Sequence, residues 1–102
     1  MRLEIQSPEV ALSPQLVACI ESKFTSVRRR FSRKVLAIHV FLRRGTFKQR
    51  PSCLLVVQLR RRRQWVFQAA CDDLFSAVEG AWQCLHNEPR LIPLALPAGK
   101  RP

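Results

Sequence analysis

A long amphipathic helix is the element that this sequence specifies most clearly. Its apolar residues recur at intervals of three or four, the spacing of a single helix face: Leu16, Ile20, Phe24, Val27 and Phe31. Ser13 can cap the free amides at the start, and Pro14 suits the first helical position because its missing N–H would be unpaired there anyway. A helix with one apolar face needs a second apolar layer, which the rest of the chain has to supply.

Four other segments have the two-residue period of half-buried strands. We expect strands over residues 1–6, 34–44, 52–60 and 64–70. Their inward residues are predicted to be Leu3, Ile5, Leu36, Ile38, Val40, Leu42, Cys53, Leu55, Val57, Leu59, Trp65, Phe67 and Ala69. Residues 45–51 then form a basic loop, and residues 61–63 lie at the tip of the last hairpin.

A second helix follows the last strand. Asp72 and Asp73 provide its cap and first-turn acid, and Pro89 ends it. Its apolar stripe consists of Leu74, Ala77, Val78, Ala81, Trp82 and Leu85. Residues 89–102 contain four prolines and no period, which is typical of a flexible tail.

The predicted order is β-α-β-β-β-α, in a single α+β domain over residues 1–88. A mostly antiparallel four-stranded sheet with both helices on one face buries the two helical stripes together. The helix between the first two strands is a crossover, so these strands are parallel if they are neighbours.

The charge of the chain indicates its partner. The formal net charge is +11 on 102 residues, and repulsion among these like charges lowers the stability of a small domain. Such an excess favours a polyanionic partner, RNA or DNA. Arginine also offers a planar donor fork that suits phosphate. The candidate phosphate-binding residues are Lys23, Arg28, Arg29, Arg30, Arg33, Lys34, Arg43, Arg44, Lys48, Arg50, Arg60, Arg61, Arg62 and Arg63. A charge run can instead be a solvated face or protect a sheet edge, but four consecutive arginines exceed that need.

The sheet face away from the helices has two interpretations. His39 and Phe41 are candidates for stacking on bases, as sheet aromatics do in other RNA binders. Phe41, Leu54, Val56 and Val66 also make this face unusually apolar, which favours a protein contact such as a homodimer.

The sequence argues against several other classes. It shows no Gly-rich phosphate loop and no Ser-His-Asp or Cys-His pattern, so we expect neither an enzyme nor a cofactor or small-molecule substrate. Cys19, Cys53, Cys71 and Cys84 include no C-x-x-C pair, so we expect no metal site and four buried thiols in a reducing compartment. No signal peptide or membrane span is evident, and a cytoplasmic location is expected.

Three segments resemble one family. Residues 1–6 (Met-Arg-Leu-Glu-Ile-Gln) are similar to its opening strand, and residues 10–31 resemble its first helix, with a Ser cap, a Lys-Phe pair and a closing Phe. Residues 73–79 (Asp-Leu-Phe-Ser-Ala-Val-Glu) resemble the opening of its second helix. The family is that of ribosome hibernation-promoting factors and ribosome-associated inhibitors, also called sigma-54 modulation proteins, and the chain resembles a divergent short form of it over about residues 1–86.

The resemblance implies a fold similar in outline to double-stranded RNA-binding domains and no enzymatic activity. It implies binding to ribosomal RNA in the messenger and transfer RNA channel of the small ribosomal subunit, which silences translation under stress or in stationary phase. Lys23, Arg28, Arg29, Arg30 and Arg33 match the family's basic positions on and just after its first helix. Two departures stand out: residues 80–88 carry no Lys or Arg where the family has several, and residues 60–63 are all Arg where it is Gly/Asn-rich. A general RNA- or DNA-binding module that kept the fold but lost the ribosome is therefore the alternative.

Overall fold

The expected element order is confirmed. In the computed structural model, which describes residues 1–8, 11–45 and 48–88, it runs β1 (Arg2–Gln6), α1 (Pro14–Phe31), β2 (Val35–Arg43), β3 (Ser52–Leu59), β4 (Gln64–Ala70) and α2 (Leu74–His86). A short 3-10 turn, η1 (Arg60–Arg62), joins β3 to β4. The predicted tail, residues 89–102, lies outside the described residues.

The four strands form one sheet in the order β1-β2-β3-β4. β1 runs parallel to β2, with Ile5 opposite Val40, as the helical crossover between them requires. β2 and β3 are antiparallel, with Val40 opposite Leu55, and β3 and β4 are antiparallel, with Val57 opposite Trp65. The sheet is therefore mixed, with a single parallel pair at one edge.

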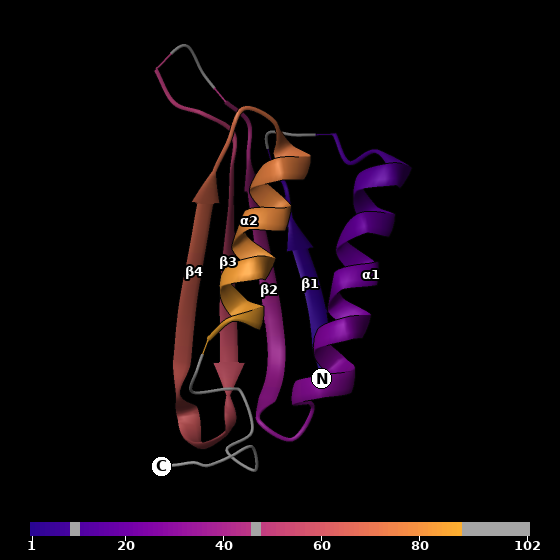
Figure 1. The fold of residues 1–102 in the computed structure, drawn as a ribbon, viewed down its shortest axis with the longest axis vertical. Coiled ribbons are helices and arrows are strands. Elements are labelled where there is room, and N and C mark those ends of the chain that lie inside the picture. The colour runs from indigo at the N-terminus through magenta and orange to yellow at the C-terminus, as the bar shows by residue number, and fades with distance from the viewer. Residues whose placement is uncertain (9–10, 46–47, 89–102) are drawn as a thin grey trace.

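Both helices cover the same face of the sheet (Figure 1). The core between the layers includes Ile20 and Phe31 of α1 and Val78 and Trp82 of α2, each at most 2% exposed. Ile38, Val40, Leu42, Cys53, Leu55 and Val57 supply the sheet side of this core. The helical and strand periods predicted the buried face of each element correctly, apart from one position in β2.

That position is Leu36, which was predicted to point inward. The register between β2 and β3 shifts between Val35 and Ala37, so Val35 is buried and Leu36 is 43% exposed. A bulge adds one residue to one strand of a pair and so moves the preceding side chains to the opposite face. The prediction for Leu36 is therefore wrong, and Val35 takes its place in the core.

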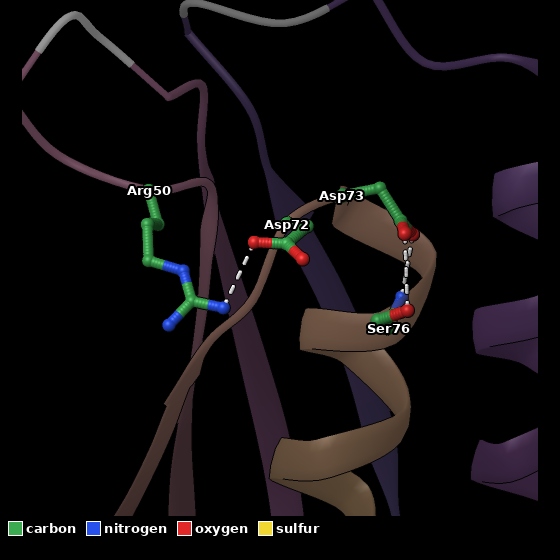
Figure 2. A network of polar contacts seen from close by, with 4 residues as sticks. All are labelled: Arg50, Asp72, Asp73 and Ser76. Carbon is green, nitrogen blue, oxygen red and sulfur yellow. Dashed lines mark hydrogen bonds and ion pairs between the residues drawn. The ribbon is translucent and has the colours of Figure 1, made fainter.

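Ser13 caps α1 as predicted, and Asp73 caps α2, but the prediction of an acid in the first turn of α2 is wrong because both aspartates precede that turn. Oγ of Ser13 accepts a hydrogen bond from the backbone N–H of Leu16 at 3.1 Å. Asp73 accepts one from the backbone N–H of Ser76 at 2.8 Å and a second from the Ser76 hydroxyl at 3.1 Å (Figure 2). These hydrogen bonds stabilise the carboxylate and hold the pKa of Asp73 below its usual value.

The four cysteines are free thiols, but they are not all buried as predicted. Cys53 is fully buried, Cys19 and Cys71 are half-buried, and Cys84 is exposed on α2. Burial raises the pKa of Cys53 to about 12, because the thiolate is poorly solvated in the core. The prediction is wrong for Cys84, which lies on the outer face of α2 where the apolar stripe does not reach.

This difference predicts the order of thiol modification. In the native protein a thiol reagent should modify Cys84 first and Cys53 last, with Cys53 reacting only when the chain unfolds. Peptide mapping by mass spectrometry at increasing denaturant would measure this, with Cys84→Ser as the control that removes the fast phase. Fast native modification of Cys53 would contradict the packing of β3.

Candidate nucleic-acid interface

The fold separates most of the candidate basic residues into two groups at opposite ends of the sheet (Figure 1). The α1–β2 turn and the β3–β4 hairpin lie at one end, and the β2–β3 loop lies at the other. We call the first group the basic end: Arg28, Arg29, Arg30, Arg33, Lys34, Arg60, Arg61, Arg62 and Arg63. These are nine of the eighteen lysines and arginines of the chain. The second group, the loop cluster, consists of Arg43, Arg44, Lys48 and Arg50.

Direct contacts join the two segments of the basic end. Nε of Arg60 donates a hydrogen bond to the carbonyl oxygen of Arg33 at 2.6 Å, and the backbone N–H of Arg60 donates to the carbonyl oxygen of Lys34 at 3.2 Å. The backbone N–H of Lys34 in turn donates to the carbonyl of Phe31, at the end of α1. Arg60 therefore fixes the hairpin against the end of α1, so the basic residues of the hairpin and those of the α1–β2 turn form one surface.

A hollow lies at this junction, with a volume of about 500 Å³. Cationic residues from both segments line it, together with two apolar residues: Arg33, Lys34, Arg60, Arg61, Arg63, Leu59 and Trp65. So many cations around one hollow raise the local positive potential, which attracts anions. We call this site the hairpin hollow.

The hairpin tip has an unusual backbone. Arg61 has φ 66° and ψ 32°, and Arg62 has φ 61°, so two successive arginines occupy the left-handed region. This conformation costs about 1–2 kcal/mol for each residue that has a Cβ, and glycine adopts it without that cost. A tip of this shape would be more stable with Gly or Asn, so its arginines carry a cost in stability.

The rest of the basic end lies on the last turns of α1. The guanidinium of Arg30 lies 5.1 Å from the centre of the Phe31 ring, a cation–π distance. The nearby His86 of α2 has a lowered pKa because of burial first, and then because of the positive charges of Arg30 and Lys23. Arg29 and Arg30 also border a second hollow, of about 450 Å³, with Ser22, Thr25 and Ser26.

Two candidate residues have acidic partners. Nζ of Lys23 lies 3.7 Å from Glu79 of α2, so this lysine bridges the helices. Arg50, in the loop cluster, forms an ion pair with Asp72 at 3.0 Å, which fixes the loop to the start of α2 (Figure 2). The loop cluster is therefore partly neutralised by a carboxylate beside it.

The sheet face opposite the helices carries the two predicted stacking residues. His39 is largely covered, with Nδ1 3.7 Å from Glu4 and with Nε2 buried and lacking a hydrogen-bond partner within the described ranges. Phe41 is half-buried between Gln6 and Leu54 in the strand register. Val66 is 58% exposed and lies opposite Val56, so the face is apolar. Stacking and a homodimer contact at this face stay predictions.

Residues 1–8, 11–45 and 48–88 also bear on two other classes of site. In those ranges no cluster of three or more His, Cys, Asp or Glu side chains could hold a metal ion. Neither helix there is both long and apolar enough to cross a bilayer.

Sequence reasoning missed two residues of the hairpin hollow. Leu59 and Trp65 were predicted only as inward strand residues, but both also line the hollow. Trp65 is half-buried, as are the other inward residues of β4, Phe67 and Ala69, because β4 is an edge strand of the sheet. An inward aromatic within two residues of an arginine-rich tip was the signal that could have indicated it.

Two solved structures have this fold. A ribosomal subunit interface protein from Coxiella burnetii superposes with a TM-score of 0.70 and 22% identity, covering 89% of this chain and 93% of that chain. The N-terminal domain of Protein Y from Thermus thermophilus gives a TM-score of 0.64 and 19% identity, covering 82% and 87%. No protein-family model and no curated protein sequence matches this chain. The fold that the family resemblance implied is therefore confirmed by structural similarity.

Proposed function

We propose that this protein is a non-enzymatic, cytoplasmic, ribosome-associated factor that binds ribosomal RNA through its basic end. Its action would be to occupy the messenger and transfer RNA channel of the small subunit and silence translation under stress, as the resemblance to hibernation factors implies. A ribosomal subunit interface protein among the structural neighbours supports a ribosomal partner.

The observation that carries this proposal is the joining of the α1–β2 turn to the β3–β4 hairpin. The 2.6 Å hydrogen bond from Arg60 to the carbonyl of Arg33 connects cations that are far apart in sequence. Nine cations on one end of a small domain can contact several successive phosphates at once. Each contact releases condensed counterions, and this release is the main source of affinity without sequence choice.

The position of this surface explains how α2 can lack basic residues. From Leu74 to His86 the helix contains no Lys or Arg, and its inner side is committed to the core through Ala77, Val78 and Trp82. The phosphate contacts that the family's second helix is expected to make would here fall to the hairpin, at the end of the sheet where α2 ends (Figure 1).

Sedimentation of a cell lysate through a gradient tests the proposal. At low salt the protein should travel with small-subunit or whole-ribosome particles. If the basic end makes roughly six to ten phosphate contacts, affinity should fall by about 10³- to 10⁵-fold between about 50 and 200 mM salt. Protein that stays in the light fractions at both salt concentrations would contradict a ribosomal partner.

The alternative is a general RNA- or DNA-binding module. It predicts that naked duplex or single-stranded RNA competes with ribosomes for the protein at similar concentrations. A ribosome-specific factor should instead keep its ribosome association in the presence of such a competitor. The observation favouring the alternative is again the absence of Lys and Arg from α2, a departure from the family pattern.

A further inference from the structure

The hairpin hollow combines two kinds of chemistry. Most of its lining is cationic, from Arg33, Arg61 and Arg63 among others, while Leu59 and Trp65 supply apolar surface. Duplex RNA presents its phosphates on an outer surface and hides the faces of its bases, so an exposed charged surface is enough to bind it. A concave site with an aromatic wall fits a ligand that has both an anion and a planar ring.

The aromatic wall is held in place. The Trp65 ring packs edge-on against Phe67, with centroids 6.5 Å apart and an interplanar angle of 87°. Leu59 beside it is 7% exposed, and its backbone N–H donates a hydrogen bond to the carbonyl of Arg63 at 2.8 Å. Because Arg60 is also bound to the α1–β2 turn, the hollow is preorganised on both sides.

The size of the hairpin hollow and the backbone strain at its edge are both typical of a ligand-binding site. A volume of about 500 Å³ falls within the range of about 300–1,000 Å³ that is usual for small-ligand sites. The left-handed conformations of Arg61 and Arg62 hold the tip in a shape that arginine does not favour. Such strain concentrates at ligand clamps, where the surrounding structure over-determines it.

We propose that the hairpin hollow takes one unpaired nucleotide of RNA, with the phosphate among the arginines and the base against Trp65. The proposal deepens the proposed function and rests on it for the choice of RNA as partner. Unpaired bases stack readily on aromatic side chains because every base has a π-face. The protein then prefers RNA at loops, bulges or single-stranded segments over continuous duplex.

Tryptophan fluorescence can test this directly, because the chain has two tryptophans in different environments. Trp82 is 1% exposed in the core, so a change in emission on adding RNA reports Trp65. The probes are a single-stranded oligoadenylate and a duplex RNA of the same length. We expect the single strand to quench emission with a saturable curve and the duplex to cause little change.

Two variants separate stacking from charge. Trp65→Leu should weaken single-strand binding about tenfold, with duplex binding unchanged, because stacking on an aromatic residue is worth this much per base. Trp65→Phe should keep most of the affinity while abolishing the quenching, and it controls for damage to the packing of β4. Unchanged emission at saturating single strand, or equal weakening of both RNAs by Trp65→Leu, would overturn the proposal.

Sedimentation distinguishes failure of the nucleotide site from failure of the proposed ribosomal function. Wild-type protein that travels with ribosomes but shows no quenching by oligoadenylate overturns the nucleotide site alone. Protein that is quenched by oligoadenylate but never travels with ribosomes supports the nucleotide site and overturns the ribosomal partner.

Discussion

Replacement of Arg33, Arg61 and Arg63 by glutamine is expected to weaken binding to ribosomes or RNA about 100-fold or more. The three residues come from the two sides of the hairpin hollow, where they would share the phosphates of one bound strand. A hydrogen bond to a charged group is worth about 1.5–3 kcal/mol, so losing three outweighs the removal of self-repulsion. The slope of log affinity against log salt should also fall by about 2.1, since each phosphate contact with a single strand adds about 0.7.

The loop cluster offers a matched control. Arg43→Gln, Arg44→Gln and Lys48→Gln together remove the same three charges from the other end of the sheet, and each triple variant has a formal net charge of +8, down from +11. Long-range attraction to a polyanion depends on net charge and would fall similarly in both. Equal weakening in the two variants would show that charge alone, and not the basic end, determines binding.

The design leaves Arg60 unchanged for a structural reason. Its Nε and backbone N–H hold the hairpin against the carbonyls of Arg33 and Lys34, so replacing it would change the shape of the hollow as well as its charge. Equilibrium binding by filter retention or fluorescence anisotropy measures the affinities, and circular dichroism shows whether each triple variant remains folded.

The fold could be predicted from sequence because its strongest signals are local. Apolar spacing assigns one face to each helix and strand. Ser13 and Asp73 mark where the two helices begin, because their side chains accept hydrogen bonds from free backbone N–H groups of the first turn. The parallel β1–β2 pair also follows from local information, since a helix between two neighbouring strands forms a crossover.

Sequence reasoning was wrong or incomplete mainly at residues whose environment depends on the three-dimensional fold. The bulge near Leu36 depends on how β2 pairs with β3, and the alternation of one strand cannot show a shifted partner. The ion pair between Arg50 and Asp72, 3.0 Å long, also joins distant segments and was not predicted, while phosphate binding by Arg50 stays a prediction. Cys84 was predicted to be buried from its residue type alone, although it lies outside the apolar stripe of α2.

The site was predictable in charge but not in shape. Arginine runs in the sequence indicate a polyanion, and the structure brings the end of α1 and the hairpin together as one surface. Alternation placed Trp65 on the inward face but could not show that this half-buried residue of an edge strand also lines the hollow. The hollow exists only because two chain segments meet there.

The second large effect concerns the hairpin tip, where stability and binding should change in opposite directions. Replacing Arg61 by Asn and Arg62 by Gly gives the pair that most readily adopts two successive positive φ angles. At position 62, glycine removes about 1–2 kcal/mol of strain and costs about 0.5–1 kcal/mol through its greater unfolded-state freedom. At position 61, asparagine keeps its Cβ and relieves a smaller part, so the fold should be stabilised by about 1 kcal/mol. The Tm should rise by roughly 4–8 °C, while binding to RNA weakens.

A second double variant separates strain from charge. Arg61→Gln with Arg62→Gln removes the same two charges but keeps a Cβ at both left-handed positions, so it should gain less stability. Thermal unfolding of both variants measures the difference, which isolates the backbone term because the charge term is common to them. If the Asn-Gly variant were no more stable than the Gln-Gln variant, the tip would not be strained. If it were more stable and bound RNA as tightly as the wild type, the two arginines would not contribute to binding. The expected result, a more stable protein that binds less well, would mean that stability at this tip is given up for contact with the partner.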